Sequence, residues 1–179
     1  MYLGIDLGTS EIKAVLMDGD GTIVGTAGQP LQISRPHAHW AEQSPEDWWQ
    51  ATHGAVGMLR KSFPAHLSAV RAIGLSGQMH GATLLDRADR PLRPAILWND
   101  TQASAECLAL TARAPDIESV TGNLAMPGLT APKLLWVGEH EPEMFRNTAS
   151  ILPNRQMLVE RQQRFRELYS ASKPFFAGR

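Results

Sequence analysis

The sequence predicts an α/β domain, in which strands alternate with helices. Short β-prone apolar runs at residues 2–5, 12–17 and 22–27 are separated by polar turns. A segment with the start signals of a helix follows at 44–61, and another strand-like run comes at 70–76. Alternation of this kind is typical of α/β folds. With 179 residues, 43% of them hydrophobic, the chain is long enough to bury one core of ordinary size, with or without a small appended piece.

The first three strands are predicted to form a meander. The runs at 2–5 and 12–17 lie on either side of a turn that contains Gly8. The sequence Asp-Gly-Asp-Gly at 18–21 then makes a second turn before the run at 22–27.

The segment at 44–61 is predicted to be a helix. Ser44 is a suitable N-cap, and Pro45 suits a first helical turn because its missing N–H is not needed there. Glu46 and Asp47 place negative charge near the positive end of the helix dipole. We expect the helix to end near Lys61 and to face the core with four apolar side chains: Trp48, Trp49, Val56 and Leu59.

The rest of the chain continues the alternation. The run at 70–76 is predicted to be a short central strand. The runs at 82–86 and 95–98 are expected to add two strands around a turn at 87–90. A helix is then expected from position 100 to about position 113.

Composition narrows the classes of function. A formal net charge of −1 argues against nucleic acid as a partner, because phosphate backbones need a basic surface. No apolar stretch approaches the roughly 20 residues of a membrane span, and no basic leader precedes the first strand, so we expect a cytoplasmic protein with no membrane partner. The single cysteine, Cys107, excludes an internal disulfide and is interpreted as a small helix residue.

The first turn carries a candidate phosphate site. Gly8 lets the backbone approach a ligand, so the N–H and hydroxyl groups of Thr9 and Ser10 are candidate phosphate donors. Asp6 is a candidate magnesium ligand through water, and Lys13 is suited to neutralising phosphate charge. An ordinary β-hairpin with a polar tip explains the same residues equally well.

Two later strands end in side chains that suit a sugar. The strand at 70–76 leads into Gln78, Met79 and His80, and the strand at 95–98 leads into Asp100. Simpler interpretations are a helix-capping aspartate at position 100 and a satisfied core imidazole at position 80. Together with Asp6, three strand ends would converge on polar groups, as in the ligand crevice of an α/β sheet.

Four segments together carry a resemblance to a known family. Residues 6–10, 76–81, 97–100 and 128–140 resemble the FGGY carbohydrate kinases, and the last segment fits the family's amino-terminal signature throughout. The resemblance covers residues 1–153. It implies an actin-like, ribonuclease-H-like ATPase domain with a mixed sheet and flanking helices, the first of two domains that enclose a cleft for MgATP and sugar.

The resemblance also implies roles for the candidate residues. The Gln-Met-His sequence favours the bacterial members that phosphorylate D-xylulose over the glycerol kinases. Kinases for another ketose, a polyol or gluconate, and a non-catalytic sugar- or nucleotide-binding remnant, remain alternatives. The implied ATP and Mg²⁺ side consists of Asp6, Gly8, Thr9, Ser10 and Lys13, and the implied sugar side consists of Gln78, Met79, His80 and Asp100.

Further expectations concern the second half of the chain. The helix at 133–140 is interpreted as a packing element, and the loop at 121–132 as a cover over the substrate pocket. The pair His37 and His39 has no third ligand beside it in the sequence, so we assign it no metal.

The chain also departs from the family. The family's catalytic aspartate opens the second domain and has no counterpart in these 179 residues, and the adenosine-binding glycines are missing as well. We therefore expect this chain to be inactive by itself and to self-associate through an exposed domain interface. Residues 1–153 are interpreted as an incomplete amino-terminal domain. The atypical tail at 154–179 is interpreted as a frameshift product, with a genuine amphipathic helix as the alternative.

Overall fold

The computed structural model describes residues 1–152, which form two compact units. The sheet unit contains residues 1–31 and 46–77, and the helix-rich unit contains residues 32–45 and 78–152 of the described chain. Composition predicted one core of ordinary size, whereas the described residues divide into these two units.

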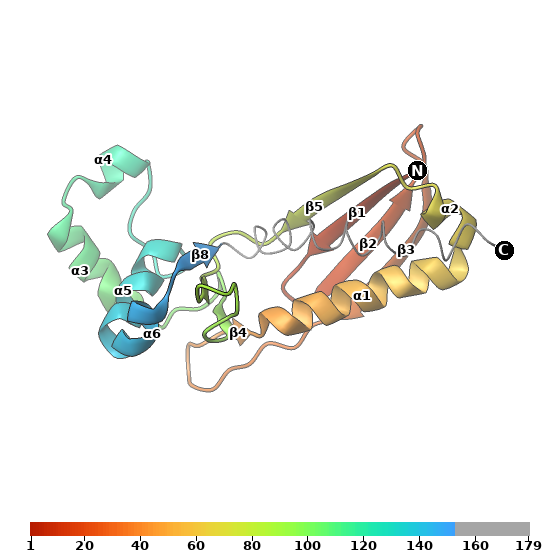
Figure 1. The fold of residues 1–179 in the computed structure, drawn as a ribbon. Helices are drawn as coiled ribbons and strands as arrows, with labels where there is room; N and C mark the ends of the chain where they lie inside the picture. The colour runs from red at the N-terminus through yellow and green to blue at the C-terminus, as the bar shows by residue number, and fades with distance from the viewer. Residues whose placement is uncertain (153–179) are drawn as a thin grey trace. The chain divides into compact units, whose positions relative to one another are not determined.

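The sheet unit is built on four strands in the order β3-β2-β1-β5 (Figure 1). The predicted meander is confirmed, because β2 pairs antiparallel with both β1 and β3. β5 pairs parallel with β1, which makes the sheet mixed. The strands are β1 (Tyr2–Leu7), β2 (Glu11–Met17), β3 (Ile23–Pro30) and β5 (Ala72–Gly77).

One face of this sheet is apolar. Side chains alternate along a strand, so every second residue of β1 and β2 is buried while its neighbours reach the other face. Asp6 and Lys13, which lie opposite one another in the register, are on the exposed face. The buried side chains of the two strands are Leu3, Ile5, Leu7, Ile12, Ala14 and Leu16.

Helix α1 (Pro45–Ser62) runs alongside the sheet, and a short helix, α2 (Pro64–Ser68), follows it (Figure 1). The predicted helix is confirmed within one residue at each end. Trp48 and Leu59 are fully buried, whereas Trp49 and Val56 are only partly buried. The helix has acidic residues in its first turn and basic residues in its last, which complements its dipole.

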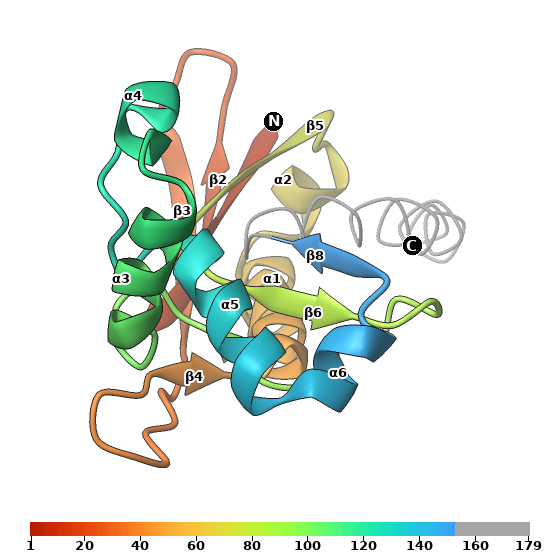
Figure 2. The same ribbon diagram turned by 90° about the vertical axis from the view of Figure 1, so that its left-hand side faces the viewer.

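The helix-rich unit combines four helices with two small sheets (Figure 2). β4 (Glu42–Gln43) pairs with β7 (Ala95–Ile96), and β6 (Thr83–Leu85) pairs with β8 (Ser150–Leu152), both antiparallel. The helices are α3 (Ser104–Arg113), α4 (Ile117–Thr121), α5 (Thr130–His140) and α6 (Pro142–Asn147). None of the described helices has the length and apolar character needed to cross a membrane.

The core of this unit joins both small sheets to α3 and α5. Its buried members are Ala82, Leu84, Ile96, Ala103, Trp136 and Val137, and Trp40, Leu92 and Leu134 pack against them. The role predicted for residues 133–140 as a packing element is confirmed by the burial of Trp136 and Val137.

Three predicted details are wrong in this unit. The runs at 82–86 and 95–98 do not pair as a full hairpin: a bridge joins Ala82 to Ile96, but the main partners of β6 and β7 are β8 and β4. The helix expected from position 100 begins at Ser104. The loop expected at 121–132 is shorter, because α4 and α5 take its two ends.

Candidate functional site

The turn between β1 and β2 is tight, and Gly8 makes it so. The Gly8 N–H donates to the Glu11 carbonyl across 3.1 Å, which closes the hairpin. A Cβ at Gly8 would lie 2.8 Å from that carbonyl oxygen, closer than a real Cβ approaches. Thr9 and Ser10 form the tip, where Ser10 is exposed and its carbonyl accepts from the Leu31 N–H at 2.7 Å. The hairpin presents polar groups at its tip, as the phosphate prediction requires.

Lys13 pairs with Glu11, a partner that we did not predict. Its Nζ lies 2.9 Å from Glu11 Oε1, and both side chains are about half exposed. The hydrogen bond and charge of Glu11 raise the pKa of Lys13, and Asp6 adds to this effect. A phosphate at this hairpin would compete with Glu11 for the Lys13 ammonium group. The spacing Glu-x-Lys on one strand was the available signal, since residues two apart share a face.

The segment 78–81 leaves the sheet through an unusual backbone conformation. His80 has φ of 62°, in the left-handed region that a residue with a Cβ seldom occupies. Its side chain is exposed, and Met79 is 66% exposed, while Gln78 is partly buried. Two of the three predicted sugar-binding side chains of this segment are therefore accessible.

Lys133, on α5, lies beneath this segment. Its side chain has no solvent exposure, and its Nζ donates to the His80 carbonyl at 2.9 Å and to the Gly128 carbonyl. Burial lowers the pKa of Lys133 from 10.5 to about 8, and the negative charge of Asp100 opposes this shift. From the sequence we predicted only a packing helix at 133–140. The burial of Lys133 was not predicted, because a lysine is rarely buried without a special reason.

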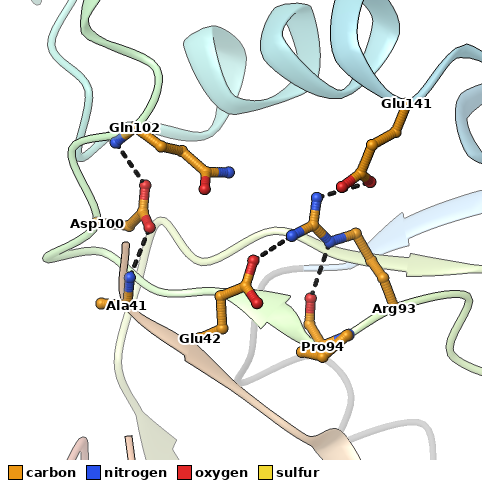
Figure 3. Close-up of polar contacts among 7 residues, drawn as sticks. All are labelled: Ala41, Glu42, Arg93, Pro94, Asp100, Gln102 and Glu141. Atoms are coloured by element: carbon orange, nitrogen blue, oxygen red, sulfur yellow. Dashed lines mark hydrogen bonds and ion pairs between the residues drawn. The ribbon is translucent and has the colours of Figure 1, made fainter. Parts of the chain in front are cut away.

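Asp100 is fully buried and its carboxylate binds two backbone amides (Figure 3). Oδ2 accepts from the Ala41 N–H at 2.7 Å, and Oδ1 accepts from the Gln102 N–H at 2.9 Å. The first bond joins residues far apart in the sequence, and the second forms an Asx-type turn that delays the start of α3. Burial raises the pKa of Asp100. The helix-capping interpretation of Asp100 is wrong, because the N-cap of α3 is Ala103 and receives no side-chain cap, whereas the Asp100 carboxylate closes a turn and reaches Ala41. Direct contact of Asp100 with sugar stays a prediction.

Arg93 connects three elements beside Asp100. Its guanidinium pairs with Glu42 of β4 and, at 2.7 Å, with Glu141 at the end of α5 (Figure 3). Its Nε donates to the Pro94 carbonyl at 3.3 Å, and its Cζ lies 5.5 Å from the centroid of the Trp136 ring. Burial raises the pKa of Glu42, and the charge of Arg93 opposes this effect. Nothing in the local sequence around Arg93 signalled this buried network.

The predicted residues fall into two groups. Asp6, Gly8, Thr9, Ser10 and Lys13 lie together in the sheet unit, and Gln78, Met79, His80 and Asp100 lie together in the helix-rich unit. The prediction that three strand ends meet at one sheet is wrong in part. β1 and β5 are neighbours, with Asp6 opposite Ser76, but β7 belongs to a separate sheet.

Other candidate groups lie elsewhere in the described part of the chain. Glu106, Glu139 and His140 offer ligand atoms within 4.8 Å of one another, and this group includes neither Asp6 nor the His37 and His39 pair. Cys107 is a buried residue of α3, and burial raises the pKa of its thiol, which agrees with an unreactive helix residue. The interpretation of the tail at 154–179 lies outside the described residues.

Known proteins resemble the chain in sequence and in fold. The model of the FGGY family of carbohydrate kinases, N-terminal domain, matches residues 1–164. The xylulose kinase of Escherichia coli K12 is 54% identical over 152 residues, covering 85% of this chain and 31% of that protein. The chain therefore spans about a third of the length of this relative.

Solved structures confirm the architecture. A xyloylose kinase from Brucella ovis superposes with a TM-score of 0.86 at 49% identity, covering 88% of this chain and 33% of that one. A gluconate kinase from Lactobacillus acidophilus superposes with a TM-score of 0.82 at 25% identity, covering 89% of this chain and 32% of that one. The described chain, with its mixed sheet and its helices, is the first domain of a two-domain kinase with an actin-like ATPase fold. The chain belongs to the FGGY family of carbohydrate kinases.

Proposed function

We propose that this chain is the amino-terminal part of a kinase that transfers the γ-phosphoryl group of ATP to the 5-hydroxyl of D-xylulose. The identity of 54% with the xylulose kinase of Escherichia coli carries the proposal. The exposed side chains of Met79 and His80 are accessible to a small polar ligand, which supports it. We place the parent enzyme in xylose catabolism in the cytoplasm.

The sheet unit supplies the proposed phosphate side. The Thr9 and Ser10 hydroxyls and the Lys13 ammonium group would contact the phosphates of ATP, and Asp6 would hold Mg²⁺ through water. Asp6 and Lys13 are register partners on the exposed face, so a carboxylate for the metal and a cation for phosphate lie side by side. Mg²⁺ would spread the negative charge that develops on the transferred group.

The helix-rich unit supplies the proposed sugar side. Gln78 and His80 would hydrogen-bond the hydroxyls of the sugar, and Met79 would contact its carbon chain. Asp100 uses both carboxylate oxygens for backbone amides, so its first contribution is to hold the segment 97–100 in place. Phosphoryl transfer also needs a base for the hydroxyl proton, a role that the family gives to an aspartate of the second domain.

Gluconate is the second candidate substrate. The structural match to a gluconate kinase reaches a TM-score of 0.82, against 0.86 for the Brucella ovis structure, although its identity is only 25%. A polyol or another ketose would use the same kinds of hydrogen bond. Sugar-binding measurements separate these cases.

A chimaeric enzyme tests the proposed function. Residues 1–152 replace the matching segment of the Escherichia coli xylulose kinase, and phosphorylation of D-xylulose, D-ribulose, gluconate and glycerol is compared. We expect a preference for D-xylulose, and His80→Ala should lower kcat/KM for D-xylulose about tenfold or more through loss of a hydrogen bond to the sugar. His66→Ala, at an exposed histidine of α2, is the matched control and should leave the rate unchanged. A folded chimaera that prefers gluconate or glycerol would refute the proposal.

A further inference from the structure

Lys133 is a charged side chain without solvent exposure on a helix whose other buried residues are apolar or proline. Burying an ammonium ion is unfavourable unless hydrogen-bond acceptors replace water. The acceptors here are the backbone carbonyls of His80 and Gly128, from two loops 53 and 5 residues away in the sequence. A packing role alone would be met by leucine or methionine, so the retained charge calls for another explanation.

The first acceptor belongs to a strained residue. His80 has φ of 62°, and a residue with a Cβ keeps such a conformation only when its surroundings enforce it. The Lys133 Nζ lies 2.9 Å from the His80 carbonyl oxygen and holds the orientation of that peptide. This peptide joins His80 to Gly81, so its orientation constrains the backbone that carries the exposed His80 side chain.

The second acceptor belongs to an equally constrained position. A Cβ at Gly128 would lie 2.8 Å from the Trp98 carbonyl oxygen, so the loop before α5 rests directly on the segment that ends in Asp100. The charge of Asp100 also acts on Lys133. Three segments, 78–81, 97–100 and 126–129, are therefore arranged around one ammonium group.

We propose that Lys133 is the positioning residue of the sugar side: its buried ammonium group fixes the His80 and Gly128 backbones so that the side chains of residues 78–80 are held ready for a sugar. Lys133 itself touches no sugar in this arrangement. The identity of the sugar rests on the proposed function, whereas the effect on the backbone does not.

The test compares Lys133→Met with the same change at the exposed Lys61 in the complete 179-residue chain. Hydrogen exchange is followed by mass spectrometry for residues 78–81 and 126–129, with β1 and β2 as internal references, and D-xylulose binding is measured by calorimetry. We expect Lys133→Met to speed exchange in both loops at least tenfold, to leave the references unchanged and to weaken D-xylulose binding at least tenfold. Lys61→Met should change none of these.

The two readouts separate this proposal from the proposed function. Unchanged exchange at 78–81 in a folded Lys133→Met protein overturns the positioning role, as does undiminished D-xylulose affinity. If the wild-type chain binds gluconate instead of D-xylulose while Lys133→Met still loosens both loops, positioning stands and the substrate assignment fails.

Two further measurements test the proposal if the Lys133→Met protein does not fold. Lys133→Gln keeps amide donors on a shorter stem and should give a smaller increase in loop exchange. In the wild-type chain, acetylation by acetic anhydride should modify Lys133 at least tenfold more slowly than Lys61, and a bound sugar should slow it further, because coupling between two sites is reciprocal. Equal rates at the two lysines, or a bound sugar without effect, would overturn the proposal.

Discussion

At the scale of single residues, Gly8 determines the geometry of the candidate phosphate turn. The Glu11 carbonyl both closes the hairpin and occupies the space that a side chain at position 8 would need. The glycine is therefore required by close approach of the backbone. Its neighbours Thr9 and Ser10 depend on it for their position at the tip.

The change Gly8→Ala should lower the free energy of unfolding by about 1–3 kcal/mol, because the new Cβ must displace a backbone oxygen 2.8 Å away. Urea unfolding followed by circular dichroism measures this. Gly74→Ala is the control, since a Cβ there meets nothing within 4 Å. Equal stability of the two variants would show that the hairpin relaxes without cost.

Lys133 predicts a pH dependence with a defined sign. Burial lowers its pKa from 10.5 to about 8, so between these pH values the unfolded chain binds more protons than the folded one. Stability relative to Lys133→Met should therefore rise from about pH 8 to 10.5, by up to roughly 3 kcal/mol for a shift of this size. Below pH 8 the cost of the buried charge is fully present and the difference should be flat.

Denaturant unfolding of the wild-type and Lys133→Met chains at pH 7, 8, 9 and 10 checks this sign. Burial raises the pKa of the Cys107 thiol and the charge of Lys133 lowers it, so both proteins carry Cys107→Ala in this comparison. Lys61→Met controls for the loss of an ordinary lysine. A wild-type advantage that falls above pH 8 would contradict the prediction.

At the scale of elements, the Arg93 network joins β4, β7 and α5. Its members lie too far apart in sequence for local hydrogen bonding, and the arginine stacks near Trp136 in the core of the helix-rich unit. Asp100 adds a second link, from the turn before α3 to the Ala41 backbone at β4. These polar links fix the small sheets, which are too short to be stable by their own ladders.

The change Arg93→Met should destabilise the helix-rich unit by about 3–5 kcal/mol, because it leaves the buried Glu42 carboxylate without its cation. The loss should be smaller at pH 5 than at pH 8, since burial already raises the pKa of Glu42 and a protonated carboxyl carries no charge to bury. Thermal unfolding at both pH values measures it. Arg113→Met, which breaks an exposed pair with Glu139 at 3.5 Å, should cost less than about 1 kcal/mol.

At the scale of the whole molecule, the helix-rich unit leaves several apolar side chains uncovered. Leu108 is 77% exposed and Val120 is 74% exposed, and Leu124 and Met126 are also exposed. Exposed apolar groups in such number favour association. The chain spans about a third of the length of the Escherichia coli relative. In a full-length enzyme, the remaining residues would be available to cover these apolar side chains.

We predict that the 179-residue chain self-associates at concentrations of tens of micromolar. The double change Leu108→Lys and Val120→Lys should shift it toward the monomer, because it places charge at the two most exposed apolar positions of this unit. Light scattering after size-exclusion chromatography measures the mass. Ala105→Lys with Ala112→Lys adds the same charge at exposed sites of α3 and is the control. A monomeric wild-type chain would refute the prediction.

Sequence alone predicted the elements whose signals are local. Short β-prone apolar runs on either side of a glycine turn identified β1 and β2, and proline with flanking acids identified the start of α1. The four family segments identified the kinase family, which the match over residues 1–164 confirms. Local signals suffice in these cases because period, cap and turn chemistry act over a few neighbouring residues.

The tertiary structure decided what depends on partners far along the chain. In the structure, β6 and β7 pair with strands other than those predicted. The Asp100 carboxylate accepts a hydrogen bond from the Ala41 amide, and the Lys133 ammonium group donates one to the His80 carbonyl. The physical reason is that a buried polar group is stable only where its acceptor or donor arrives from elsewhere in the fold. The sequence determined the family and the candidate side chains, and long-range packing determined which of them are exposed and which hold the others in place.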